Sequence, residues 1–123
     1  MPTDLGERFA NTVAAKDAAA LKELLKPRVN FRALTPGGYW ERDDADAVVD
    51  DVILGTWFSP ERSITRILKV SCATVGTVDC VGYRFQAKLP DGDFIIEQQA
   101  YFEAENDKMS WLRILCSGFV HDD

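Results

Sequence analysis

The sequence predicts an α+β fold in which a curved antiparallel sheet forms a cone closed by three N-terminal helices. The first half of the chain contains three segments whose apolar residues recur at helical spacing. The second half contains four strand-like runs in succession, between residues 64 and 119. A long curved sheet covered on one side by helices encloses a pocket, so this fold class also predicts where a ligand would bind.

The composition limits the class of protein and its partners. The 123 residues fit a single domain, residues 1–123, which is large enough to fold without metal ions or disulfide bonds. No segment approaches the ~20 apolar residues of a membrane span, and the start of the chain lacks the pattern of a secretory signal. We therefore expect a cytoplasmic protein with no membrane partner.

Charge and cysteine content exclude further classes. With 20 acidic and 14 basic residues the net charge is −6, and the basic residues are scattered, so we expect no nucleic-acid partner. Cys72, Cys80 and Cys116 lack the spacing of zinc ligands and are interpreted as buried thiols in a reducing compartment. We expect no cofactor and no metal site.

The first two helices are predicted to be short. The first covers residues 4–15, with Asp4 and Glu7 as a capping box. The second begins at Asp17 and ends near Lys26, because the following proline disfavours helical geometry in the residue before it. The apolar residues at helical spacing are Leu5, Phe9, Val13, Leu21, Leu24 and Leu25.

A short hairpin over residues 29–42 is predicted to separate the second helix from the third. The third helix begins at Asp43, ends at Gly55 and has the strongest amphipathic pattern in the chain. Its apolar positions are Ala45, Val48, Val49, Val52 and Ile53. We interpret its aspartates as a solvated acidic face and not as a metal site.

The best-formed strands run over residues 78–89 and 94–104, joined by a turn at Pro90-Asp91-Gly92. Each strand alternates an apolar face with a mixed polar face. The apolar face could pack on the helices while the polar face meets water. Alternatively, the polar face lines a pocket and the apolar face forms a dimer interface. Periodicity does not separate these alternatives, because a bulge exchanges the two faces.

Three motifs accompany this order of helices and strands: VNFRALTPGG at residues 29–38, LPDG at 89–92, and EQQAYF at 97–102, which leads through 106–109 into WLR at 111–113. Together they resemble the nuclear transport factor two-like superfamily, in particular its polyketide-cyclase-like (SnoaL-like) branch, with a distant likeness to limonene epoxide hydrolase. The resemblance covers nearly the whole chain and implies a cone-shaped fold that commonly pairs through its sheet. It does not select an activity, because members include isomerases, dehydratases, cyclases, hydrolases and proteins that only bind.

The catalytic residues of the epoxide hydrolases are only partly present. The resemblance places Arg84 at the position of their catalytic arginine, whereas Gln86 and Ser117 stand where they have two aspartates. The acid and base of that mechanism are therefore missing. The one histidine, His121, lies close to the C-terminus and is interpreted as a tail residue.

The remaining candidates for catalysis lie on the mixed faces of the hairpin, where Arg84, Glu97, Gln99 and Tyr101 are predicted to point into one cavity. Glu97 would act as a general base if burial raised its pKa, and Tyr101 would donate to a developing oxyanion beside Arg84. The alternative is that Arg84 and Glu97 form an exposed cross-strand ion pair of little energetic value.

Aromatic side chains are candidates for the wall of a pocket that would suit a flat apolar or aromatic molecule, and ordinary core packing is the alternative for each. The predicted substrate-binding residues are Phe31, Trp40, Trp57, Gln99, Arg113 and Ser117. The sequence thus predicts a homodimeric protein that binds a small molecule. It would be either a metal-independent lyase, isomerase or cyclase that uses Arg84, Glu97 and Tyr101, or a non-catalytic module for ligand binding or protein association.

Overall fold

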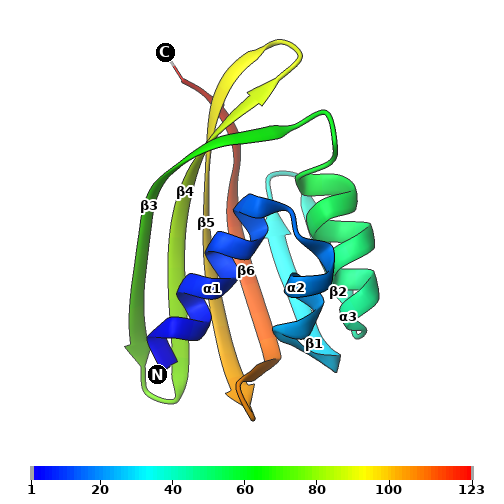
Figure 1. Cartoon of the computed structure of the whole chain (residues 1–123), viewed down its shortest axis with the longest axis vertical. Helices are drawn as coiled ribbons and strands as arrows, with labels where there is room; N and C mark the ends of the chain where they lie inside the picture. Colours follow the sequence, from blue (N-terminus) through cyan, green and yellow to red (C-terminus); the bar gives the residue numbers. More distant parts are fainter. Residues whose placement is uncertain (1, 123) are drawn as a thin grey trace.

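The computed structural model describes residues 2–122, with side chains from residue 5 onward, and consists of a six-stranded sheet with helices on one face (Figure 1). The strands are β1 (Leu25–Thr35), β2 (Gly38–Arg42), β3 (Ser63–Val75), β4 (Val78–Leu89), β5 (Gly92–Glu105) and β6 (Lys108–His121). The helices are α1 (Pro2–Ala15), α2 (Ala18–Glu23) and α3 (Ala45–Ala47), which continues as the π-helix η1 (Val48–Trp57).

The sheet has the order β2-β1-β6-β5-β4-β3, and its edge strands β2 and β3 do not pair with each other. The α+β class is confirmed, whereas the sheet itself stays open and does not close into a cone. The prediction of a purely antiparallel sheet is wrong for one pair of neighbouring strands, because β1 and β6 are parallel. Parallel neighbours require a long connection, and here the third helix and four strands lie between them in the chain.

The second helix ends earlier than its sequence suggested. It stops at Glu23, and β1 begins at Leu25, so Pro27 lies inside a strand. The pairing of β1 with β6 is interrupted between Leu25 and Asn30. A proline is tolerated there because its missing N–H removes no hydrogen bond from the ladder. The Asp4 side chain, the expected cap of the first helix, lies outside the described residues.

The third helix buries all five predicted apolar positions, but most of it is wound as a π-helix. The amide of Phe58 donates to the carbonyl of Ile53, five residues earlier, at 2.8 Å. In this winding the carbonyl oxygen of Asp50 would lie 2.0 Å from a Cβ atom at position 55. Only glycine fits at that point, so Gly55 permits the winding and the helix continues past it to Trp57.

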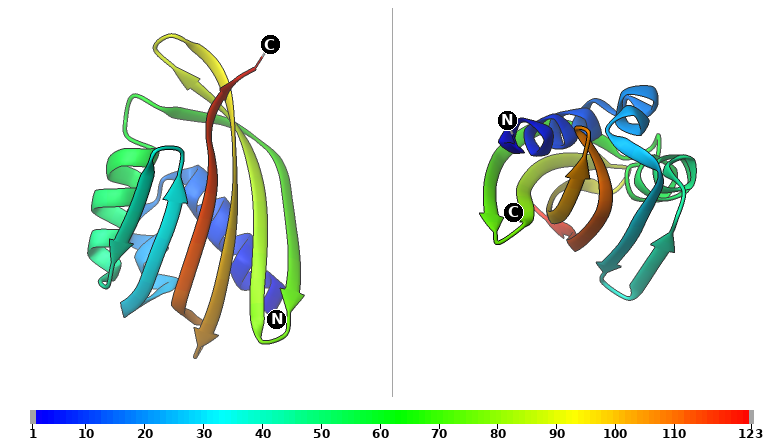
Figure 2. Two further views of the ribbon diagram at one scale, coloured as in Figure 1. Left: turned by 180° about the vertical axis from the view of Figure 1, so that it is seen from behind. Right: turned by 90° about the horizontal axis from the view of Figure 1, so that it is seen from below.

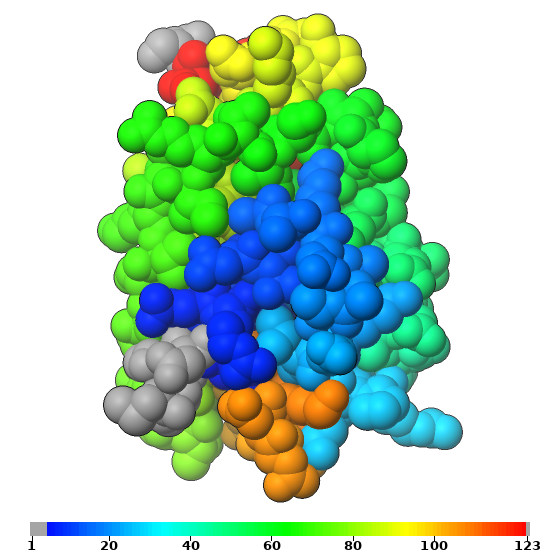
Figure 3. Space-filling model, viewed as in Figure 1, coloured from blue at the N-terminus to red at the C-terminus, as the bar shows by residue number. Residues whose placement is uncertain are grey.

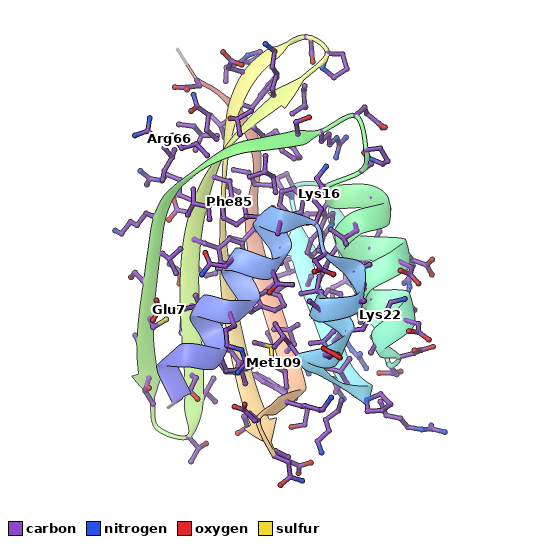
Figure 4. The ribbon with its side chains drawn as sticks, in the orientation of Figure 1. Glu7, Lys16, Lys22, Arg66, Phe85 and Met109 are labelled. Carbon is purple, nitrogen blue, oxygen red and sulfur yellow. The ribbon has the colours of Figure 1, made fainter. Side chains whose placement is uncertain are left out.

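The four predicted long strands are confirmed, and their alternation separates two faces of the sheet. On β4, Val81, Tyr83 and Phe85 are at most 2% exposed, whereas Arg84 between them is exposed. The buried set contacts the helices, and Figure 4 shows Phe85 between β4 and the helices. We call the side under the helices the covered face and the opposite side the open face.

The helices protect only one of these two faces. In Figure 3, α1 and α2 lie across the middle of the covered face. In the left view of Figure 2, no helix lies in front of the open face. Within the described residues, no helix has both the length and the apolar composition needed to cross a membrane.

Candidate functional site

The four polar residues predicted to share a cavity do share one face, but it is the open face. The strand register pairs Arg84 with Glu97, and Gln99 and Tyr101 follow at alternate positions of β5. The prediction that they point into the fold is wrong. The intervening positions of both strands carry the larger apolar side chains, and burying these against the helices turns the polar set outward.

The contacts among these residues are those of a solvent-exposed surface. The Arg84 guanidinium lies 3.1 Å from the Glu97 carboxylate, with both side chains nearly half exposed, and such a pair contributes less than ~1 kcal/mol. Tyr101 Oη donates to Gln99 Oε1 at 3.1 Å, and the Glu97 amide donates to Ser117 Oγ at 2.9 Å. The hollow beside Arg84 and Glu97 has a volume of about 40 Å³, enough for a few water molecules only.

The predicted substrate-binding residues are divided by the sheet. Phe31 and Trp57 lie in the core with ring centroids 6.1 Å apart, and half-buried Trp40 meets Trp57 edge-on at the same separation. These three therefore form an aromatic wall on the covered side. Arg113 and Ser117 lie on the open face with Gln99, so the six residues do not line one pocket.

A buried polar pair on the covered face was not among the predicted site residues. Tyr83 Oη donates to Gln98 Oε1 at 2.6 Å, and both side chains are 2% exposed. Burial, with a smaller contribution from Cys116, holds the pKa of Tyr83 well above its ordinary value. The hydroxyl therefore remains a donor, which fixes the amide oxygen of Gln98 toward Tyr83 and leaves its nitrogen for another partner.

Two buried donors lack an acceptor. Neither Gln98 Nε2 nor Trp57 Nε1 has a hydrogen-bond partner among the residues that the structure describes. Burying such a donor without a partner costs about 1–3 kcal/mol, and native proteins contain few of them. The sequence did carry a signal for Gln98, because a glutamine stands between Ile96 and Ala100 at an apolar position of the alternation.

The covered side offers hydrogen-bond donors but no buried carboxylate, imidazole or ammonium group. In the described part of the chain, the buried polar groups include the hydroxyls of Ser59 and Tyr83, the Gln98 amide and the Trp57 indole N–H, and no aspartate, glutamate, histidine, lysine or arginine is buried. The described residues contain no group of three histidine, cysteine or carboxylate side chains that could hold a metal ion. The interior can therefore orient an acceptor but has no carboxylate to move a proton.

A surface groove lies on the helix side of the sheet, separated from this polar pair by aromatic rings. It has a volume of about 520 Å³ and lies between the end of α1, the loop after η1 and the start of β3, with Phe58 among its lining residues. Phe58 contacts Phe85 edge-on at 6.1 Å, and Phe85 stacks on Tyr83 at 5.0 Å. The rings of Phe58 and Phe85 thus lie packed between the groove and the Tyr83–Gln98 pair.

Lys16 holds the loop that borders this groove (Figure 4). Its Nζ donates to the carbonyl of Ser59 at 2.9 Å and also to that of Arg62. Partial burial lowers the pKa of Lys16, and the nearby charge of Glu61 opposes that shift. Because both carbonyls accept hydrogen bonds from the ammonium group, the lysine stabilises the loop and does not act as a nucleophile.

No protein-family model matches this chain, and no curated protein matches it. Solved structures do match. An NTF2-like (nuclear transport factor two-like) protein from Burkholderia thailandensis aligns with a TM-score of 0.72 and 14% identity over 95% of this chain and 91% of that chain. A Pseudomonas putida protein with the provisional name of polyketide cyclase gives a TM-score of 0.70 and 13% identity over 93% and 90%. An epoxide hydrolase from M. tuberculosis, described as like limonene epoxide hydrolase, gives 0.68 and 9% over 94% and 82%. At such identities the likeness concerns the fold and not the activity.

Proposed function

We propose, from the premise that this chain has the fold of the nuclear transport factor two-like superfamily, that it binds a small neutral molecule on the covered side of its sheet. The observation that carries the proposal is the pair of buried N–H donors at Gln98 and Trp57 that lack an acceptor. A ligand with an apolar body and a carbonyl-type oxygen would satisfy one or both of them.

The geometry favours binding over proton-transfer catalysis. A lyase, isomerase or cyclase needs an acid or base within reach of the reacting atoms. The predicted candidates Arg84, Glu97 and Tyr101 belong to the open face, where the hollow beside Arg84 and Glu97 would not hold a metabolite. We therefore favour the non-catalytic alternative, in a cytoplasmic protein without cofactor or metal, and place Tyr83 in the role of orienting the Gln98 amide.

The test compares two ligands that differ in one oxygen. Acetophenone carries a carbonyl and ethylbenzene does not, while their apolar bodies are nearly identical. We expect acetophenone to bind more tightly and to shift the NMR signals of the Gln98 side-chain amide and the Trp57 indole N–H. In the Gln98→Leu variant its affinity should fall to that of ethylbenzene, whose own affinity should not change. Equal affinities in the wild-type protein would contradict the proposal.

A homodimer formed through the open face is the second candidate role, that of an association module. The observation that favours it is the exposed Arg84–Glu97 pair, because in a two-fold contact each contact between two different residues occurs twice, once in each direction. Arg84 of one copy could then meet Glu97 of the other. A face of alternating cations and anions is self-complementary in this way.

Sedimentation velocity at tens of micromolar tests this role. We expect a species of twice the 13.8 kDa monomer mass. Glu97→Arg should weaken the dimer, and the exchange of both charges in Arg84→Glu/Glu97→Arg should restore it. A wild-type protein that sediments as a monomer would exclude the dimer at this concentration.

A further inference from the structure

The open face contains a groove that the proposed interior site does not use. It has a volume of about 500 Å³ and lies across β1, β2, β5 and β6. Most of its lining surface is apolar, and Leu34, Tyr39 and Leu115 within it are more than half exposed. The lining residues that carry the argument are Arg32, Leu34, Tyr39, Tyr101, Arg113 and Leu115.

Two arginines lie side by side in this groove. Arg32 and Arg113 occupy paired positions of the parallel strands β1 and β6. Like charges directly opposite each other on a sheet are unfavourable unless an anion compensates them. Arg32 is compensated, because Glu41 and Asp43 each lie 3.0 Å from its guanidinium.

Arg113 is not compensated in this way. Its Nη1 donates to the main-chain carbonyls of Asn30 and Leu112, and its guanidinium stacks 4.3 Å above the Trp111 ring. Among the residues that the structure describes, no carboxylate forms an ion pair with Arg113. Its Nε and Nη2 groups therefore remain as donors in a geometry that suits a carboxylate.

We propose that this groove binds a small amphipathic carboxylate, with the anion on Arg113 and the apolar chain along Leu34, Tyr39 and Leu115. The carboxylate of the ligand would compensate the charge of Arg113, and its apolar chain would cover side chains that are now exposed to water. Stacking on Trp111 holds the guanidinium plane in place, which lowers the entropic cost of binding. The site is separate from the interior one, since the sheet lies between them.

A second copy of the chain is the competing occupant. A two-fold contact whose axis passes beside Arg113 would bring this arginine against Arg113 of the other copy, with no anion to compensate them. This repulsion favours a small anion as the occupant. A dimer centred on the Arg84–Glu97 pair of the neighbouring strands avoids it.

Calorimetry with three probes tests the proposal: decanoate, decanol and acetate. Decanoate has both the charge and the chain, decanol only the chain, and acetate only the charge. We expect decanoate to bind at least ten-fold more tightly than decanol, and acetate not to bind detectably. Arg113→Gln should weaken decanoate binding at least ten-fold, and Arg113→Lys should weaken it less.

Arg66→Gln is the matched control. Arg66 is an exposed arginine on β3, on the opposite edge of the sheet from β2 and outside the groove (Figure 4), so this variant should bind decanoate as the wild type does. In NMR spectra the Leu34 and Leu115 methyl groups should shift with decanoate, and the Trp57 indole N–H should not.

Three outcomes would overturn the proposal. The first is equal affinity for decanoate and decanol. The second is a shift at Trp57, which would place the ligand in the interior instead. The third is a wild-type dimer in sedimentation that binds no decanoate, which would make the second copy the occupant of the groove. None of these outcomes decides whether acetophenone binds the interior site, so the two proposals fail separately.

Discussion

Two tyrosine–glutamine pairs lie on opposite faces of the sheet and differ in burial and in the length of their hydrogen bonds. Tyr83 on β4 donates to Gln98 on β5 at 2.6 Å on the covered face, where both are 2% exposed. Tyr101 donates to Gln99 at 3.1 Å on the open face, where both are half-buried. On the covered face, removing one partner leaves the other without a hydrogen bond, because no water reaches it. On the open face, water can take the place of either partner.

The largest expected effect contrasts two tryptophans of the aromatic wall. Trp57 is 5% exposed between Phe31 and Trp40, so Trp57→Ala should lower the free energy of unfolding by ~3–5 kcal/mol. Trp40 is half-buried, and Trp40→Ala should cost only ~1–2 kcal/mol. Urea denaturation measures both values. A larger loss for Trp40 would mean that the wall is anchored at the hairpin and not at η1.

A double-mutant cycle on the buried pair should give the next largest effect. Tyr83→Phe leaves Gln98 Oε1 without its donor, and Gln98→Leu leaves the Tyr83 hydroxyl without its acceptor, so each should cost about 1–3 kcal/mol. The double variant removes both polar groups and should be nearly as stable as the wild type or more stable. The matched cycle with Tyr101→Phe and Gln99→Leu should show changes below ~0.5 kcal/mol throughout.

If the two single changes at Tyr83 and Gln98 simply add, the pair has no energetic coupling and our view of the interior is wrong. A stable double variant that no longer binds acetophenone would support the proposal that the polar pair is retained for binding.

The buried tyrosine also predicts a dependence of stability on alkaline pH. Its folded pKa lies well above the ordinary value of 10.0, so above that pH the folded state keeps a proton that the unfolded state has lost. The free energy of unfolding should therefore fall as pH rises beyond about 10, by up to ~1.4 kcal/mol per pH unit. Tyr83→Phe should remove this part of the slope, and Tyr101→Phe should retain it. Identical slopes in the two variants would contradict the assignment.

The smallest effect is expected at the exposed ion pair. Arg84→Ala and Glu97→Ala should each change the free energy of unfolding of the monomer by less than ~1 kcal/mol, because both side chains are nearly half exposed to water. The difference in the free energy of unfolding between each variant and the wild type should be smaller still in 1 M salt, where exposed charges are screened. Thermal denaturation at two salt concentrations measures it, and a loss above 2 kcal/mol would show that the open face is drier than its exposure indicates.

The order of elements and the apolar positions followed from the sequence because both depend on local periodicity. The alternation over residues 78–104 separates two faces of the hairpin without reference to the rest of the chain. The spacing of Val48, Val49, Val52 and Ile53 marks the apolar side of a helix in the same way, and these residues are buried. The pairing of Arg84 with Glu97 followed as well, since the turn between two strands of similar length fixes their register.

Only the tertiary structure decided which side of the sheet the helices cover. That choice also decides whether each polar side chain on the strands is buried or exposed to water. Alternation assigns Tyr83 and Arg84 to opposite faces but does not say which face is buried. That depends on the helices, which pack where the larger apolar area is available to them. The burial of Gln98, the parallel pairing of β1 with β6 and the uncompensated charge of Arg113 all follow from contacts between residues far apart in the chain. A single-sequence pattern contains no record of such contacts.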